Sequence, residues 1–260
     1  MSSNILSVGT YNVAGIRKNY TKINFLYEAF KSIDIIALQE THFRDDADAS
    51  LFTQIFSTQF KLYISNCNNE THAGIALGIN FHSRLQAVRK IFEIDGRAIG
   101  VLFNIENKKI YIICVYVPAS VQNRALFLEN LFQNVSEHFC YYDECILLGD
   151  FNFTENPALD RSTNSNYERE VGSQSFRRIR NHLNLFDFFR HNFPTKQAFT
   201  FLSRSACSES RIDRIYTSNN ISNSMSSFEI KDFAISDHRA FLIRFKLNFL
   251  KTPFEKSYWI

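Results

Sequence analysis

The sequence predicts an α/β fold in which two packed β-sheets are flanked by helices. The prediction rests on about twelve short apolar runs typical of strands, a few stretches with helical spacing between them, and hairpin spacing among the central runs. A chain of 260 residues with 45% hydrophobic residues can bury a sizeable core, and no repeat, low-complexity tract or Pro-rich linker divides it. We therefore expect one domain.

The strand-like runs are apolar or alternating segments bounded by turn residues, which is the pattern of buried and half-buried strands. They occupy 5–13, 33–40, 60–66, 73–80, 84–94, 98–105, 109–117, 144–151, 198–202, 211–218, 227–235 and 239–247.

Three stretches carry apolar residues at the three- and four-residue spacing of an amphipathic helix. They are 21–32, 123–139 and 175–189, and the last also carries a basic face. The Asn- and Ser-rich stretch 160–175 between them is typical of a loop.

Charge and cysteine content exclude several classes of protein. The formal net charge of +3 permits a polyanionic partner without indicating one. Five irregularly spaced cysteines form no C-x-x-C motif, so we expect neither a disulfide framework nor a zinc site, and we expect a reducing compartment. The N-terminus has no signal-peptide pattern, and the longest apolar run, 110–119, is about half of what a membrane span needs. The expectation is a soluble intracellular protein.

Polar residues collect where the predicted strands end. The run CILLGDFN places Asp150 and Asn152 at positions i and i+2, which share a face while the chain stays extended. Taken alone, the pair fits an ordinary turn equally well. Five other strand ends also carry polar groups, however, so that the full set is Asn12, Glu40, Tyr116, Asp150 with Asn152, Asp213, and Asp237 with His238. Oxygen ligands with a single histidine have the composition of a magnesium site that handles phosphate.

These strand ends also carry a family resemblance. In order, the motifs YNVAG, LQE, YVP, GDFN, SRIDRIY and SDH resemble the exonuclease–endonuclease–phosphatase superfamily, and within it the apurinic/apyrimidinic-like endonuclease domain of non-LTR (LINE-type) retrotransposons. The resemblance runs from Asn12 to His238. It implies a four-layer α/β/β/α sandwich of two packed mixed sheets flanked by helices. It also implies a magnesium-dependent endonuclease, with Mn²⁺ as a possible substitute, that nicks one DNA strand to give a 3′-hydroxyl primer for target-primed reverse transcription.

The resemblance also implies a role for each strand-end residue. Glu40 would be the principal metal ligand, with Asn12 beside it and Asp237 as a second metal contact. Asp150 would orient or deprotonate the attacking water, and Asn152 would hold Asp150 and a phosphate oxygen. Tyr116 would donate a hydrogen bond to the phosphate. The Asp213 carboxylate would orient the His238 imidazole and favour its charged form. The other six histidines, at 42, 72, 82, 138, 182 and 191, are expected to be solvated.

DNA contacts are expected from a separate group of residues: Arg177, Arg178, Arg180, Arg204, Thr200 and Ser236. A solvated face is an equally good interpretation of the 177–180 cluster. Residues 202–210, between two runs at hairpin spacing, are expected to project towards DNA and to choose the target, as the corresponding hairpin does in the retroelement enzymes.

The resemblance further implies double-stranded DNA as partner, no membrane association, and a nuclear site of action after synthesis in the cytoplasm. Residues 1–250 would form the nuclease domain, monomeric when isolated. Residues 251–260 resemble the start of a linker to a reverse transcriptase in a longer polyprotein.

Three alternatives remain open from the sequence. They are an abasic-site repair endonuclease, a lipid or inositol phosphatase of the same superfamily, and a DNA-binding module that has lost catalysis. The phosphatase is disfavoured because such relatives differ around the second carboxylate and the histidine.

Overall fold

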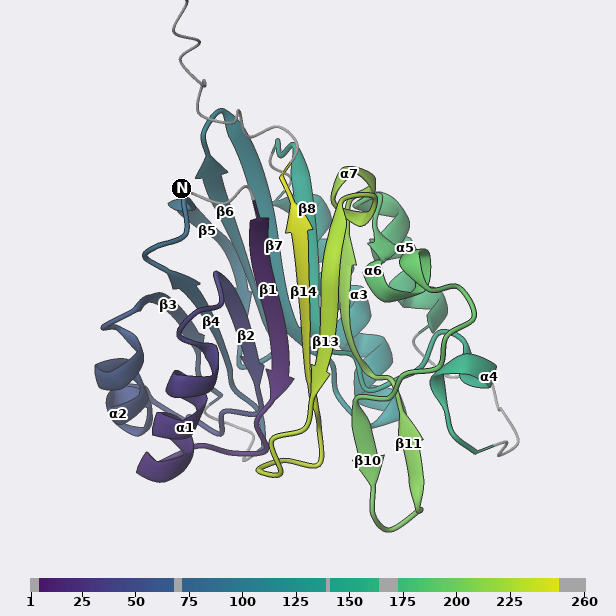
Figure 1. The fold of residues 1–260 in the computed structure, drawn as a ribbon, viewed down its shortest axis with the longest axis horizontal. Coiled ribbons are helices and arrows are strands. Elements are labelled where there is room, and N and C mark those ends of the chain that lie inside the picture. The colour runs from purple at the N-terminus through teal and green to yellow at the C-terminus, as the bar shows by residue number, and fades with distance from the viewer. Residues whose placement is uncertain (1–4, 68–71, 139–140, 164–172, 248–260) are drawn as a thin grey trace, which may run out of the picture.

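The computed structural model describes residues 5–67, 72–138, 141–163 and 173–247, in which two six-stranded sheets pack face to face (Figure 1). The first sheet has the order β13-β14-β1-β2-β4-β3. Its strands are β1 (Ile5–Asn12), β2 (Ile35–Gln39), β3 (Phe60–Ser65), β4 (Ile75–Asn80), β13 (Met225–Lys231) and β14 (Ala240–Lys246). Strands β1 and β2 are parallel and the other pairs are antiparallel, so the sheet is mixed.

The second sheet has the order β5-β6-β7-β8-β12-β9 and is also mixed, because β7 and β8 are parallel. Its strands are β5 (Gln86–Ile94), β6 (Ala98–Ile105), β7 (Lys108–Tyr116), β8 (Glu144–Asp150), β9 (Phe186–Asp187) and β12 (Asp213–Thr217). A separate hairpin of β10 (Phe201–Ser203) and β11 (Ser208–Ser210) extends beyond one end of the sheets (Figure 1).

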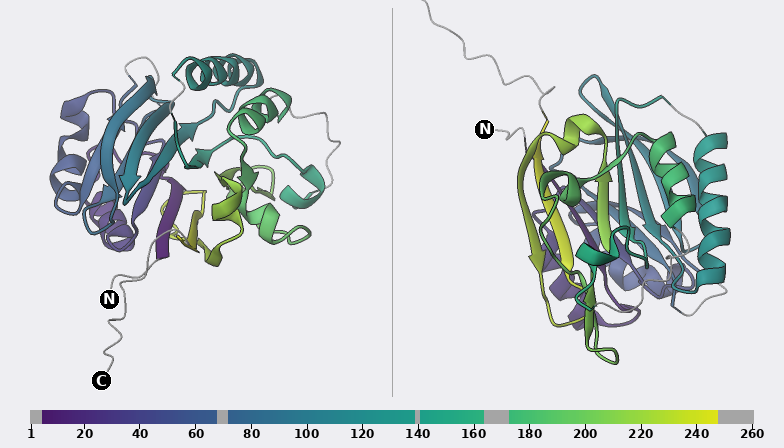
Figure 2. Two further views of the ribbon diagram at one scale, coloured as in Figure 1. Left: turned by 90° about the horizontal axis from the view of Figure 1, so that it is seen from above. Right: turned by 90° about the vertical axis from the view of Figure 1, so that its right-hand side faces the viewer.

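Helices cover the outer face of each sheet (Figure 2). Helices α1 (Tyr20–Phe30) and α2 (Asp46–Phe56) share an apolar cluster with the first sheet, and α3 (Val121–Glu137) and α5 (Ser173–His182) share one with the second. A third cluster, which includes Val8, Ile112 and Ile146, fills the space between the sheets. The four-layer α/β/β/α prediction is confirmed. The described residues also include the short helices α4 (Pro157–Asp160), α6 (Phe188–Asn192) and α7 (Asn219–Ser222), and none of the helices described is long and apolar enough to cross a membrane.

Two local expectations were wrong. The stretch 175–189 is not one helix: α5 ends at His182, and Asn184 adopts a positive φ of 51° while the Leu185 N–H donates to the Arg180 carbonyl. This left-handed helix termination stops the helix even though the apolar spacing continues. Helix α2 was not expected from the sequence. Its N-cap is Asp45, whose side chain accepts a hydrogen bond from the Asp48 N–H, and an Asp at this position is a common signal for the start of a helix.

Strand register brings the predicted site residues to one edge. Asn12 pairs with Gln39, so the ends of β1 and β2 lie together and Glu40 follows directly. Asp150 pairs with Tyr116 on one side and with Asp213 on the other. These positions converge because the carboxyl ends of β1, β2, β7 and β8 lie at the same end of the sheets as the starts of the antiparallel strands β12 and β14.

Gly149 is required where β8 reaches this edge. Its φ is +149°, and a Cβ at this position would lie 1.8 Å from the Val115 carbonyl oxygen. Backbone atoms cannot move aside as a flexible side chain can, so Gly149→Ala should destabilise the fold by at least about 2 kcal/mol in urea unfolding. Gly78→Ala is the matched control, because its added methyl group meets only side-chain carbons, at 3.1 Å and beyond. Equal stability of the two variants would contradict this explanation.

Candidate active site

The carboxylate of Glu40 is held by two hydrogen bonds to one of its oxygens. Its Oε1 accepts hydrogen bonds from Asn12 Nδ2 at 3.0 Å and from the Tyr116 hydroxyl at 2.5 Å. Burial alone would raise the pKa of Glu40, but the nearby His42 imidazole and the hydrogen bonds from Asn12 and Tyr116 outweigh burial and lower the pKa to about 2. The carboxylate is therefore ionised at neutral pH. The backbone at Glu40 has a φ of 54°, a conformation that is uncommon for a non-glycine residue and is concentrated at functional sites.

Asn12 joins the two carboxylates of the site. Its Nδ2 donates to Glu40 Oε1 and also to Asp150 Oδ2, the latter at 2.9 Å. Its oxygen accepts the Ala14 N–H at 3.0 Å, which fixes the orientation of the amide. Asn12 thus presents N–H groups to the site and bridges the two carboxylates, while its role as a metal ligand stays a prediction.

Tyr116 is also placed differently from its prediction. It was expected to donate to the substrate phosphate, whereas its hydroxyl donates to Glu40. The Arg97 guanidinium lies over the Tyr116 ring at 4.5 Å from the ring centre. In this structure Tyr116 therefore helps to hold the Glu40 carboxylate.

Asp150 is fully buried, and Asn152 holds it through a turn. The Asn152 backbone N–H donates to Asp150 Oδ1 at 2.9 Å, and Asn152 Nδ2 donates to the Val117 carbonyl at 2.9 Å and approaches Asp150 Oδ2 at 3.4 Å. The expected extended arrangement of the two residues is wrong, because β8 ends at Asp150 and Asn152 has a φ of 53°. The two polar groups nevertheless meet, through the backbone of a turn that is common for Asp and Asn.

The charge state of Asp150 is set by its surroundings. Burial and the nearby Asp213 carboxylate raise the pKa of Asp150 to about 7, against the opposing effect of His238 and the hydrogen bonds from Asn12 and Asn152. A carboxyl group that titrates near neutral pH is suited to accept a proton during a reaction.

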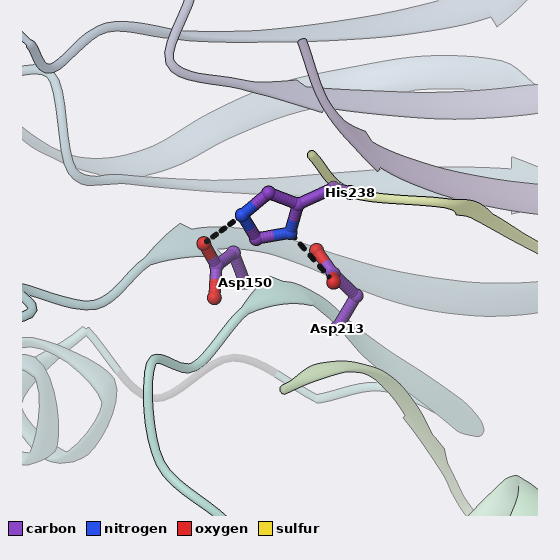
Figure 3. A group of neighbouring side chains, drawn as sticks. All are labelled: Asp150, Asp213 and His238. Atoms are coloured by element: carbon purple, nitrogen blue, oxygen red, sulfur yellow. Dashed lines mark hydrogen bonds and ion pairs between the residues drawn. The ribbon is translucent and has the colours of Figure 1, made fainter. Parts of the chain in front are cut away.

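His238 lies between two carboxylates (Figure 3). Its Nδ1 is 2.8 Å from Asp213 Oδ2, and its Nε2 is 3.9 Å from Asp150 Oδ2. Burial would lower the pKa of His238, but the charges of Asp213 and Asp150 and the hydrogen bond with Asp213 raise it to about 9. The ring is therefore an imidazolium at neutral pH. The ligand atoms of Asp150, Asp213 and His238 lie within 4.8 Å of one another and form a candidate metal site.

Thr200 and Ser236 fasten the segments around this group. Thr200 is completely buried, and its hydroxyl accepts the N–H groups of Ile212 at 3.2 Å and Asp213 at 3.0 Å. Its predicted contact with DNA is therefore wrong, because it positions the backbone at Asp213. The half-buried Ser236 donates to the Asn12 carbonyl at 2.9 Å and accepts the His238 N–H at 3.1 Å. Asp237 is exposed at the rim of the site, where its carboxylate contacts Ser236 Oγ at 3.4 Å.

The predicted DNA-binding arginines lie in two places. Helix α5 packs on the outer layer with α3, where Arg178 pairs with Glu129 at 3.0 Å and Arg180 pairs with Glu155 at 3.1 Å (Figure 2). Arg177 is exposed on the same helix. Because two of the three charges are paired within the protein, this cluster matches the alternative of a solvated face. Arg204 is exposed on the hairpin and lines a cavity of about 610 Å³ together with Ser236 and Asp237.

One site residue was missed at the sequence level. His42 was expected to be solvated, but it is half-buried with Nε2 3.6 Å from Glu40 Oε2. Its position two residues after Glu40 was the available signal, but a loop histidine beside a carboxylate is common without function. The remaining five histidines outside the site, 72, 82, 138, 182 and 191, are exposed as expected.

Residues 9–238 match the model of the Endonuclease/Exonuclease/phosphatase family. The chain belongs to this family. It therefore combines a phosphodiesterase nuclease fold with a candidate metal site, and the predicted superfamily is confirmed.

Individual relatives agree with the family assignment. The chain is 26% identical over 249 residues to a transposon TX1 uncharacterized 149 kDa protein of Xenopus laevis; the match covers 93% of the chain but only 18% of that protein. The fold is similar to that of the AP endonuclease LMAP from Leishmania major, with a TM-score of 0.76, 18% identity and coverage of 93% and 88% of the two chains. It is also similar to the 3′ phosphatase NExo from Neisseria, solved bound to product DNA hairpin, with a TM-score of 0.74, 19% identity and coverage of 93% and 99%.

Proposed function

We propose that this nuclease is the DNA endonuclease of a non-LTR retrotransposon, which nicks one strand and leaves a 3′-hydroxyl primer for target-primed reverse transcription. The observation that carries the proposal is the arrangement of Asp150, Asp213 and His238 beside the clamped Glu40 carboxylate. The similarity to a transposon protein over 93% of the chain favours the retrotransposon function over abasic-site repair. Double-stranded DNA is the proposed substrate.

The donor set at Glu40 fits a divalent cation such as Mg²⁺. The carboxylate is ionised, and its two hydrogen-bond donors, Asn12 and Tyr116, both use Oε1, which leaves Oε2 to face an ion. Hard carboxylate oxygens are the ligands that Mg²⁺ takes, usually with several waters and substrate oxygens. We propose Glu40 as the principal ligand, with Asp237 at the rim as a second contact. When bound, the ion would neutralise charge on the phosphate and on the leaving oxygen.

Protein residues would supply proton transfer and stabilisation of the transition-state charge. Asp150, held by Asn12 and Asn152, would accept the proton of the attacking water at Oδ2, the oxygen that also faces His238. The His238 imidazolium, fixed at Nδ1 by Asp213, would place its charge against the phosphoryl oxygens in the transition state. Because the imidazolium is oriented before the substrate arrives, little reorganisation is needed during the reaction.

A plasmid-nicking assay tests this function. Purified protein should convert supercoiled DNA to the open circle in Mg²⁺ and lose this activity with a chelator. The nick should be extendable by a DNA polymerase without prior treatment, since a 3′-hydroxyl is left. Absence of nicking, or a strong preference for an abasic oligonucleotide over intact DNA, would overturn the proposal.

The cellular setting is also part of the proposal. We infer a monomeric nuclease domain within a longer polyprotein that carries a reverse transcriptase, and action in the nucleus, where target DNA lies. The chain spans 18% of the length of its transposon relative, which leaves ample length for such regions in that protein. The proposed linker at 251–260 lies outside the described residues.

We further propose that the hairpin residues 202–210 choose the target. The hairpin is tied to the site, because the Leu202 N–H donates to the Asp237 carbonyl at 2.9 Å and Phe201 bridges to His238. Its tip extends from the same end of the sheets, with Arg204 exposed near it (Figure 1). A guanidinium group there is suited to a narrow minor groove, whose negative potential attracts it.

Exchange of residues 203–209 for a Gly/Ser linker should therefore change which sites are cut while leaving Mg²⁺-dependent nicking within about tenfold of the original rate. The measurement is the sequence spectrum of nicks on random DNA. Arg204→Ala, which keeps the hairpin, should produce part of the same change. If both variants cut the original sites, target choice does not lie in the hairpin.

A further inference from the structure

The imidazole of His42 lies beside Glu40 and has no role in the reaction proposed above. His42 Nε2 is 3.6 Å from Glu40 Oε2, the oxygen that neither Asn12 nor Tyr116 uses. The nitrogen is shielded from solvent and has no hydrogen-bond partner among the described residues. A buried polar atom without a partner is rare in folded proteins and often marks the position of an ion or a water.

The surrounding chain holds this ring in place. The His42 N–H donates to the Ala73 carbonyl at 2.9 Å, and the residue adopts a φ of 61°. Gly15, at a φ of +79°, makes room for the ring, because a Cβ there would lie 2.5 Å from His42 Nδ1. The His72 ring packs edge-on against it with the ring centres 5.1 Å apart. Two other segments, at Gly15 and at 72–73, thus keep Nε2 beside Glu40.

The distance between the two atoms is longer than a hydrogen bond and close to what a shared ion requires. A separation of 3.6 Å exceeds the range of a nitrogen–oxygen hydrogen bond. Two neighbouring ligands of an octahedral ion, each about 2.1 Å from it, are about 3 Å apart. A small adjustment of the imidazole would bring both atoms onto one ion.

We propose that His42 is a second protein ligand of the ion held by Glu40. The inference rests on the proposed metal site and deepens it, because an imidazole nitrogen changes which ion the site prefers. Magnesium favours oxygen ligands, whereas imidazole is a good ligand for first-row transition metals. A site with Glu40 and His42 should therefore bind Mn²⁺ more tightly, relative to Mg²⁺, than a site built from oxygen ligands alone.

Mn²⁺ binding to the intact protein tests the proposal without any activity measurement. Electron paramagnetic resonance gives the Mn²⁺ affinity, and pulsed measurements detect the ¹⁴N coupling of a ligating imidazole. The key variant is His42→Asn, because asparagine tolerates a positive φ and offers an oxygen in place of the nitrogen. His82→Ala is the matched control, since His82 is exposed and lines a different cavity with Ser7 and Asp34.

The original protein and His82→Ala should show the ¹⁴N coupling. His42→Asn should lose it and bind Mn²⁺ about tenfold more weakly, with a smaller change in Mg²⁺ affinity measured by competition. A coupling that is absent from the original protein, or that persists in His42→Asn, would overturn the proposal; in the second case another imidazole, such as His238, holds the ion. If His42→Asn fails to fold, its unfolding curve will show this. Gly15→Ala, whose added methyl group crowds the His42 ring, is then the second test, and it should also lose the ¹⁴N coupling.

Failure of this inference is distinguishable from failure of the proposed function. Loss of the ¹⁴N coupling in His42→Asn without any nicking by the original protein would support the ligand and refute the endonuclease. Mg²⁺-dependent nicking without ¹⁴N coupling would support the endonuclease and refute the ligand.

Discussion

Replacement of Asp150 by asparagine is expected to reduce the rate of DNA nicking by about 10²- to 10⁴-fold, the range for loss of a general base. Asparagine has nearly the same shape, but its single oxygen can keep only one of the two hydrogen bonds that Asn12 and Asn152 donate to different oxygens of Asp150. The loss would therefore combine the missing proton acceptor with one unmet hydrogen bond. Single-turnover nicking of supercoiled plasmid measures it directly.

At pH 8 the same variant should lose less stability than its one unmet hydrogen bond alone would cost. The pKa of Asp150 is raised to about 7 by burial and by Asp213, so the folded state disfavours the charged form. A raised carboxyl pKa costs stability that develops as pH rises from the unfolded value through the folded one, and this cost is fully present above about pH 7. Neutral asparagine removes that cost at pH 8. Asp143→Asn, just before the start of β8, is the control: it removes a carboxylate that binds Lys108 and should leave nicking unchanged. Nicking by Asp150→Asn within tenfold of the original rate would exclude Asp150 as the base.

The second large effect is expected at His238, where substitution by alanine should slow nicking by about 10²-fold or more, as for other removed electrostatic stabilisers. Asp213→Asn should cost less, because it keeps the ring and removes only the group that orients and charges it. The double variant should be no slower than about the His238→Ala variant, since the two residues act as a unit. A double loss equal to the product of the single losses would show that they act independently.

The pH profile gives an independent check on this pair. With Asp150 ionised above about pH 7 and His238 charged below about pH 9, the value of kcat/KM should be highest between these limits. Asp213→Asn removes the negative charge that raises both pKa values, so both limbs of the profile should move to lower pH. His191→Ala, an exposed histidine bonded to Asn223, should leave the profile unchanged. Unshifted limbs in Asp213→Asn would show that Asp213 does not set these charges.

The His238 pair should also make stability depend on pH. Its folded pKa is raised from 6.5 to about 9, so its contribution to stability is complete below about pH 6.5 and is lost as pH rises through 9. The contribution of Asp150 changes in the same sense over an adjoining range, because its cost to stability develops as pH rises from about 4 to 7. Both groups therefore lower the stability of the folded protein as pH rises into the range in which their charge states suit catalysis.

The sequence by itself determined the layered fold and the residue types at the strand ends. Apolar runs with a period of two must be buried in sheets, and helical spacing between them supplies the covering layers, so local pattern and burial agree. Glu40, Asp150, Asp213 and His238 could be identified because each stands in a short motif at the end of a strand. Glu40 and Asp150 follow or end strands, whereas Asp213 and His238 begin or precede them, and antiparallel pairing of β12 with β8 and of β14 with β1 brings both kinds of position to one edge.

Tertiary structure alone decided which polar group faces which. Asn12 bonds to Asp150 across 138 positions of sequence, and only that approach shows that its N–H groups, and not its oxygen, face the site. Thr200 became a support for Asp213, and the α5 arginines found acidic partners on other segments. His42 shows the same limit, because its position two residues after Glu40 does not reveal that its ring lies against the Glu40 carboxylate. Hydrogen bonds and ion pairs act over a few ångströms and depend on orientation, so residue type and spacing cannot specify them until the chain has folded.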